Sequence, residues 1–365
     1  MSSSSLSDSF RFFFGKEWTL SSTRMEYGAR SSGAYASLGE QEDSHFLIGG
    51  GNGTHLGSCN AVLEYTTSKQ QFTTHTPLPE PRYASAATAS AIGDGLVVTG
   101  GRPFSNSKSV LVYNKTTKDW SAMADLNIGR LHHACVSTND DKCYVLGGMA
   151  SNEDNAMDCI EELNLSTPNN NNWRVLPKRL GETRAGCCAV MHPRDPHSIV
   201  VVGGKNCRND NEYDDDNDDE FNYLDSCEIV SLLGEPQQEP QLASLTIPRA
   251  HHTLVVVEKR FLIVMGGYNS THGRLTSVEV LDLDNQQQPQ WHSMPCMRIA
   301  RSHFAAFHVP TNPKKKIVVM GGIGNGNQRL DTMEELEVKG FIDKRRAQQH
   351  EGDHDSPNKK RKTPT

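Results

Sequence analysis

The chain has 365 residues, 36% of them hydrophobic, and a formal net charge of −7 at pH 7. No apolar run reaches the roughly 18 residues of a membrane-spanning helix, and the short run Arg11–Phe14 lacks the charged lead and cleavage site of a signal peptide. Nine cysteines, irregularly spaced and without a CxxC, argue against a disulfide framework and a zinc site and indicate a reducing compartment. The acidic balance and the lack of a basic stripe argue against nucleic-acid binding.

In chain order, residues 1–15 are rich in serine and are expected to be a disordered tail. Residues 16–339 then contain an apolar run ending in a glycine pair six times. The run Phe261–Met265 is too short for a core helix and rich in β-formers, so it predicts a buried strand. A glycine pair at a strand end indicates positive φ or a close approach of another chain segment. The repeat glycines are Gly49, Gly50, Gly100, Gly101, Gly147, Gly148, Gly203, Gly204, Gly266, Gly267, Gly321 and Gly322.

Two further markers keep step with the glycine pairs. An arginine lies 17 to 20 residues before each pair, and an aromatic residue lies 10 to 12 residues before five of the six arginines. Successive pairs are 47 to 63 residues apart, a period typical of propeller blades with several short strands each. The arginines are Arg30, Arg82, Arg130, Arg184, Arg249 and Arg301, and the aromatic residues are Trp18, Phe72, Trp120, Trp173 and Trp291.

The two ends of the repeat array complement each other. The last repeat has no aromatic strand after its third strand Met333–Val338, whereas an aromatic strand around Trp18 precedes the first glycine pair. A ring in which the strand around Trp18 enters the last blade explains both ends and leaves no exposed sheet edge. We therefore predict an all-β, six-bladed β-propeller with four antiparallel strands per blade, closed by the N-terminal strand.

These markers resemble kelch repeats over about nine-tenths of the chain. Matching segments in two of the repeats are Gly100-Gly101, Val110–Tyr113, Trp120 and Arg130, and Gly266-Gly267, Val278–Asp282, Trp291 and Arg301. The resemblance implies a kelch six-bladed β-propeller. The fourth repeat departs from the pattern because no aromatic residue stands before Arg249.

The loops before the arginine strands and after the glycine pairs should emerge on one face, because successive strands alternate in direction. In kelch adaptors of ubiquitin ligases, arginines on this face of the propeller bind an acidic peptide. The resemblance thus implies partner binding by Arg102, Arg274 and Arg329, joined by Asn106, Tyr268 and Asn325, since guanidinium groups pair well with carboxylates. The six repeat arginines are interpreted as structural, with a contribution of some of them to binding left open.

The predicted function is a non-catalytic interaction module for a peptide or protein partner, acting as a substrate receptor or scaffold of a ubiquitin ligase or a nuclear complex. The alternative is a small propeller enzyme of the sugar epimerase or mutarotase type, acting in the central pocket. No catalytic residue, metal or cofactor is assigned, because no spaced motif demands an acid–base pair or converging ligands. The propeller is expected to be monomeric.

Three histidines, His132, His251 and His303, each lie two residues past a repeat arginine. Near the axis they could bind a metal, but imidazoles that hydrogen-bond to strand ends also fit this pattern, and we predict no metal.

The insert 205–225 in the fourth repeat contains eight carboxylates within residues 209–220 and is expected to be disordered. It could attract a basic partner or occupy the arginine surface itself.

Residues 340–365 form a second predicted disordered tail. Two basic clusters, separated by a polar spacer, are typical of a bipartite nuclear import signal read by an importin; the alternative is a solubilising tail. The clusters consist of Lys344, Arg345, Arg346, Lys359, Lys360, Arg361 and Lys362. The protein is accordingly expected in the nucleus, the cytoplasm or both.

Overall fold

The structure is a computed structural model that describes residues 14–25, 32–38, 43–51, 58–90, 95–150, 155–166, 172–207, 221–233, 242–285, 289–310 and 315–339. The predicted tails, apart from Phe14 and Gly15, lie outside the described residues, as do Arg30 and the acidic segment 209–220. No helix in the described part of the chain has the length and apolarity needed to cross a membrane.

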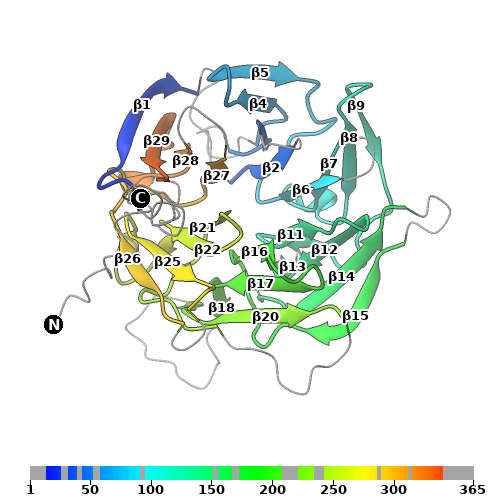
Figure 1. Ribbon diagram of the computed structural model, residues 1–365. Helices are drawn as coiled ribbons and strands as arrows, with labels where there is room; N and C mark the ends of the chain where they lie inside the picture. Colours follow the sequence, from blue (N-terminus) through cyan, green and yellow to red (C-terminus); the bar gives the residue numbers. More distant parts are fainter. Residues whose placement is uncertain are drawn as a thin grey trace, which may run out of the picture.

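Six antiparallel sheets surround a central axis like the blades of a wheel (Figure 1). The strands of blades 1 to 3, from the axis outward, are β2 (Ala34–Leu38), β3 (Ser44–Ile48), β4 (Val62–Thr66), β5 (Gln71–His75); β6 (Ala86–Ser90), β7 (Gly95–Thr99), β8 (Val110–Asn114), β9 (Asp119–Ala122); and β11 (Ala134–Ser137), β12 (Lys142–Leu146), β14 (Cys159–Asn164), β15 (Arg174–Arg179). Those of blades 4 to 6 are β16 (Cys188–Met191), β17 (Ser198–Val202), β20 (Cys227–Ser231); β21 (Thr253–Val257), β22 (Phe261–Met265), β25 (Val278–Asp282), β26 (His292–Met294); and β27 (Ala305–Val309), β28 (Lys316–Met320), β29 (Thr332–Glu337), β1 (Thr19–Arg24). The predicted six-bladed β-propeller is confirmed.

Each blade packs against its neighbours on both faces. Six hydrophobic clusters fill the six interfaces between adjacent blades. In β22, for example, Ile263 faces blade 6 while Leu262 and Val264 face blade 4. Burial on both faces explains why the second strand of every blade is a continuous apolar run rather than an alternating one.

Glycine pairs form the joints between consecutive blades. Gly100 and Gly101 end β7 with φ of 57° and 100°, which a residue with a side chain rarely adopts. A Cβ on Gly100 would lie 2.6 Å from the carbonyl oxygen of Arg130 in the next blade, and the Gly101 amide donates a hydrogen bond of 3.1 Å to that oxygen. Gly266 meets Arg301 in the same way. Glycine is therefore required here by close contact as well as by φ.

Strand β1 closes the ring, as predicted. It pairs antiparallel with β29, with Thr19 opposite Glu335 and Arg24 opposite Thr332, and an isolated bridge joins Phe14 to Val338. Trp18 is 1% exposed and its indole nitrogen donates to the Pro295 carbonyl of blade 5 at 2.8 Å. The indoles of Trp120, Trp173 and Trp291 likewise donate to carbonyls at the outer edge of the preceding blade.

Blade 4 differs from the other five because its sheet has three strands among the described residues. Trp291 of blade 5 donates to the Ala243 carbonyl at 2.8 Å, so the segment before Arg249 occupies the outer edge of blade 4 without a described strand. Blade 4 also carries a hairpin of β18 (Lys205–Cys207) and β19 (Phe221–Tyr223), which flanks the acidic segment.

Candidate functional site

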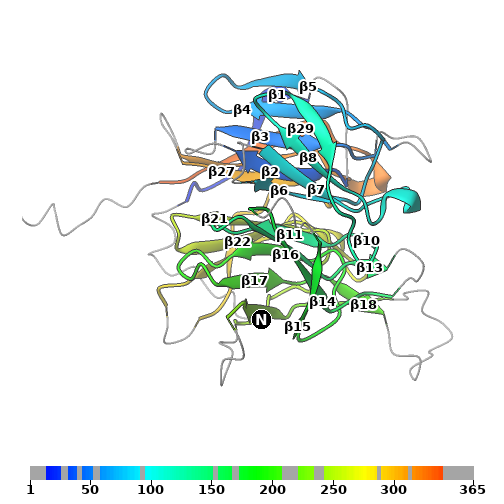
Figure 2. The same ribbon diagram turned by 90° about the vertical axis from the view of Figure 1, so that its right-hand side faces the viewer.

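One face of the propeller, which we call the loop face, gathers the loops that enter the inner strands and those that follow the glycine pairs. Figure 2 shows β10 (Arg130–Leu131), β13 (Met149–Ala150) and β18 on the same side of the molecule. In five blades the residue after the repeat arginine pairs with the residue after the glycine pair, as Tyr83 does with Arg102 and Ala185 with Lys205. These pairings fix the loops beside the axis.

At the axis, six backbone amides and carbonyls form a closed circle of hydrogen bonds, which we call the axial ring. Its members are the residues two positions past each repeat arginine. Each donates its N–H to the carbonyl of the equivalent residue in the preceding blade, over distances of 2.7 to 3.2 Å. The six are Ser32, Ala84, His132, Gly186, His251 and His303, with φ between 51° and 63°.

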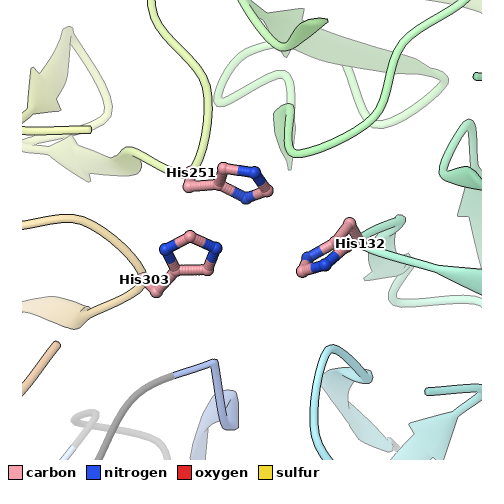
Figure 3. Close-up of side chains that lie close together, drawn as sticks. All are labelled: His132, His251 and His303. Atoms are coloured by element: carbon pink, nitrogen blue, oxygen red, sulfur yellow. The ribbon is translucent and has the colours of Figure 1, made fainter. Parts of the chain in front are cut away.

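Three members of the ring, His132, His251 and His303, point their imidazoles toward one another across the axis (Figure 3). We call them the axial histidines. Their ligand nitrogens all lie within 4.8 Å of one another. His251 stacks on His303 with ring centroids 3.9 Å apart, and His132 meets His251 edge-on at 4.8 Å. The sequence placed these residues near the axis but did not predict that they converge.

The axial histidines are held neutral. Burial, together with the charges of Lys205 and Arg102, lowers the pKa of His132 to about 4. Burial also lowers the pKa values of His251 and His303 well below the usual range, and the like charges around them, including Lys205, act in the same direction. An imidazole in a cationic, partly dehydrated site favours its uncharged form.

A cavity of about 140 Å³ surrounds the axial histidines. It is lined by the axial ring and by the next residue of each blade, which adds Gly33, Ser85, His133, Cys187, His252 and Phe304. None of these described lining residues is a carboxylate. Burial raises the pKa of the Cys187 thiol to about 11, so it remains protonated at neutral pH.

Three predicted binding residues, Arg102, Arg274 and Arg329, lie in the segments after the glycine pairs on the loop face, and we call them the rim arginines. Arg102 lies with its guanidinium 4.4 Å from the ring centroid of the exposed Phe104. Arg274, in β24 (Gly273–Arg274), donates to the Asn327 side-chain oxygen at 2.6 Å. Arg329 donates to the Gly51 carbonyl at 3.2 Å. The charges of Arg102, Arg274 and Arg329 reach the axial histidines and lower their pKa values.

The rim arginines form no ion pair with any residue that the structure describes. The Nε of Arg274 is buried and has no hydrogen-bond partner among these residues. Burial also lowers the pKa of Arg274. Such a guanidinium gains most from a carboxylate partner supplied from outside.

The other three predicted binding residues, Tyr268, Asn106 and Asn325, differ from one another in exposure and in their distance from the rim arginines. Tyr268 begins β23 (Tyr268–Asn269), and the Arg274 guanidinium lies 5.8 Å from its ring centroid. Asn106 ends the short helix η1 (Phe104–Asn106) and is 5% exposed. Asn325 begins η2 (Asn325–Asn327) and is exposed.

Five of the six repeat arginines are buried between strands, at 0 to 2% exposure; we call them the frame arginines. Each donates through Nη1 to the carbonyl of the first repeat glycine in its own blade, at 2.8 to 3.3 Å. They are Arg82, Arg130, Arg184, Arg249 and Arg301. These contacts hold the glycine joint and leave the guanidinium groups inaccessible to a ligand.

In blades 3 to 6 a glutamate on the third strand completes the frame. Arg130 Nη2 lies 2.6 Å from Glu161 Oε1, and Arg301 Nη2 lies 2.7 Å from Glu334 Oε1. The same carboxylates accept hydrogen bonds from loop-face amides, such as those of Asn127 and Arg298. The remaining pairs are Arg184–Glu228 and Arg249–Glu279. Sequence reasoning missed the four glutamates, although each is the second or third residue of the third strand of its blade.

Sequence reasoning also did not single out Lys205, which occupies the same loop position as the rim arginine Arg102. It follows Gly204 directly, as Arg102 follows Gly101, and the position after each glycine pair is the signal that could have found it. Its ammonium lies 3.4 Å from the ring centroid of Phe221.

The sequence profile of the Attractin/LZTR1 beta-propeller matches residues 45–332. Kelch-like protein 26 of Danio rerio is 29% identical over 164 residues, or 44% of this chain and 25% of that protein. Alpha-scruin of Limulus polyphemus is 26% identical over 268 residues, or 60% of this chain and 28% of that protein. The match thus spans about a quarter of the length of these relatives.

An N-acetylneuraminate epimerase of Haemophilus influenzae is 25% identical over 167 residues, or 45% of this chain and 42% of that protein. The solved structure of YjhT superposes with a TM-score of 0.55 and 15% identity, covering 72% of this chain and 84% of that one. At this identity the likeness shows a shared fold.

Proposed function

Because the chain belongs to the Attractin/LZTR1 beta-propeller family, with kelch-like proteins among its relatives, we propose that it is a non-catalytic module that binds an acidic peptide segment of a partner protein on the loop face. The observation that carries this proposal is the set of three rim arginines around the axis with no ion pair among the described residues. A carboxylate placed above the cavity mouth would meet guanidinium groups from blades 2, 5 and 6. The exposed ring of Phe104 offers apolar contact beside them.

The enzyme alternative, an epimerase acting on an acidic sugar, has support in the name of relatives from two Haemophilus influenzae strains. Among the described residues, however, the central cavity pairs no carboxylate with its histidines. An acid–base pair close to a reacting carbon is what proton abstraction requires. The lining therefore favours binding over catalysis.

The test is affinity purification of the full chain from cells, comparing wild type with the triple variant Arg102→Ala, Arg274→Ala and Arg329→Ala. The matched control replaces three arginines away from the loop face, Arg174, Arg194 and Arg260, with alanine. We expect the rim variant to lose its specific partners and the control to retain them. Partners that both variants retain would contradict the proposal.

For the basic clusters in residues 340–365 we propose nuclear import through an importin-type receptor. A fluorescent fusion that lacks residues 340–365 should then leave the nucleus, with a fusion lacking residues 1–13 as control. Undiminished nuclear accumulation of the first fusion would contradict import by this segment.

A further inference from the structure

The axial histidines form a cluster that the proposed function does not use. They come from blades 3, 5 and 6, and their ligand nitrogens lie within 4.8 Å of one another. The other ring positions carry only the small Ser32, Ala84 and Gly186, so no bulky side chain competes for the centre. Hydrogen bonds around the axial ring fix the backbone from which the three imidazoles project (Figure 3).

We propose that the axial histidines bind one divalent transition-metal ion of the Zn²⁺ class, with a fourth coordination position open toward the loop face. Metal–nitrogen bonds of about 2.0–2.1 Å place two imidazole nitrogens on one ion roughly 3–4 Å apart. The stack of His251 on His303 must open to reach this geometry. Rotation about the side-chain bonds achieves this without moving the axial ring.

The three imidazole ligands determine which kind of metal ion the site can bind. Three imidazoles with no carboxylate among the described lining residues suit Zn²⁺, Co²⁺, Ni²⁺ or Cu²⁺ and do not suit Ca²⁺ or Mg²⁺, which require oxygen ligands. A cavity of about 140 Å³ has room for the ion and for water. A single water needs roughly 10–15 Å³ of such space.

The surrounding charges set the affinity and the fourth ligand. Lys205, Arg102, Arg274 and Arg329 act electrostatically on the axial histidines. These cations weaken the binding of a metal ion, and they favour an anion such as hydroxide or a carboxylate at the open position. We therefore expect micromolar rather than nanomolar affinity, with affinity rising when one of these charges is removed.

The experiment uses the full chain, freed of any affinity tag and treated with a chelator, and titrates it with Co²⁺ while visible absorption is recorded. We expect one equivalent to bind with the d–d bands of a tetrahedral nitrogen site, and Zn²⁺ to displace it. The triple variant His132→Ala, His251→Ala and His303→Ala should show no such bands. Ala84 occupies the same ring position with φ of 55°, so alanine is compatible with the backbone there.

Three further variants keep the outcome decisive. His303→Ala alone, should the triple variant not fold, is expected to weaken Co²⁺ binding at least about tenfold, since even loss of an outer-shell partner costs that much. His272→Ala, an exposed histidine of the loop face, should leave binding unchanged. Lys205→Gln should tighten it. No stoichiometric binding at millimolar Co²⁺, or binding that His303→Ala or Lys205→Gln leaves unchanged, would overturn the assignment.

Discussion

The frame arginines and the rim arginines carry the same side chain in opposite surroundings. Arg130, Arg249 and Arg301 are fully buried, and each meets a buried glutamate and a glycine carbonyl. Arg102 and Arg329 lie partly exposed on the loop face and, among described residues, have no acidic partner. The five described repeat arginines therefore hold their blades together, whereas we propose that the rim arginines are available to a ligand.

The comparison is tested most strongly by Arg249→Ala. This change leaves Glu279, which is 1% exposed, as an unpaired buried charge, and we expect the free energy of unfolding to fall by about 3–5 kcal/mol. Urea denaturation followed by circular dichroism measures the loss. The double variant Arg249→Ala, Glu279→Leu removes the orphaned charge and should recover part of it. A loss below about 1 kcal/mol would contradict the structural role.

A buried histidine whose pKa is lowered by burial should make stability depend on pH. Burial lowers the pKa of His308 to about 4, and this side chain is 8% exposed. Because its folded pKa lies below the ordinary value of 6.5, its contribution is complete above pH 6.5 and is lost as pH falls toward 4. His308→Phe should flatten the unfolding free energy over this range by roughly 2–3 kcal/mol. An unchanged slope between wild type and variant would show that His308 is not the titrating group.

Arg82 shows how much the hydrogen bonds of a frame arginine contribute to stability when no glutamate pairs with it. Blade 2 has Leu111 where blades 3 to 6 have the glutamate, so Arg82 donates to Gly100 and Ser109 without a buried acid. We expect Arg82→Ala to lower the free energy of unfolding by about 1–2 kcal/mol, less than Arg249→Ala. Parallel urea titrations of the two variants give the order, and the reverse order would refute the importance of the glutamate.

The smallest effect on stability is expected at the rim. Alanine in place of Arg102 or Arg274 should change the free energy of unfolding by no more than about 0.5 kcal/mol, because surface substitutions seldom do more. Thermal melting of the single variants measures this. A rim variant as unstable as Arg249→Ala would remove the distinction between the two sets.

Much of the fold could be predicted because its signals are local and repeated. The glycine pairs, the strands before them and the aromatic residues recur in phase, and the surplus strand around Trp18 matched a gap in the last repeat. Blade 4 was harder, since it has no aromatic residue before Arg249 to mark a fourth strand.

The site was less accessible to sequence reasoning because it depends on contacts between residues that are far apart in the sequence. Glu279 lies 30 residues from Arg249 and Glu228 lies 44 residues from Arg184, and the loops between them differ in length. The convergence of His132, His251 and His303 depends on their positive φ just outside the regular strands. A positive φ at a residue other than glycine cannot be inferred from the residue pattern.

The seam between β1 and β29 determines how the molecule must assemble. Thr19 meets Glu335 across 316 positions of sequence, and the amide of Ser32 joins the carbonyl of His303 at the same boundary. During synthesis β1 emerges long before β29 exists, so the last blade and the axial ring can be completed only after residues 332–337 have been made. Contacts this distant in sequence slow folding, and a chain halted before residue 332 would carry an unmatched strand at each end of an open arc.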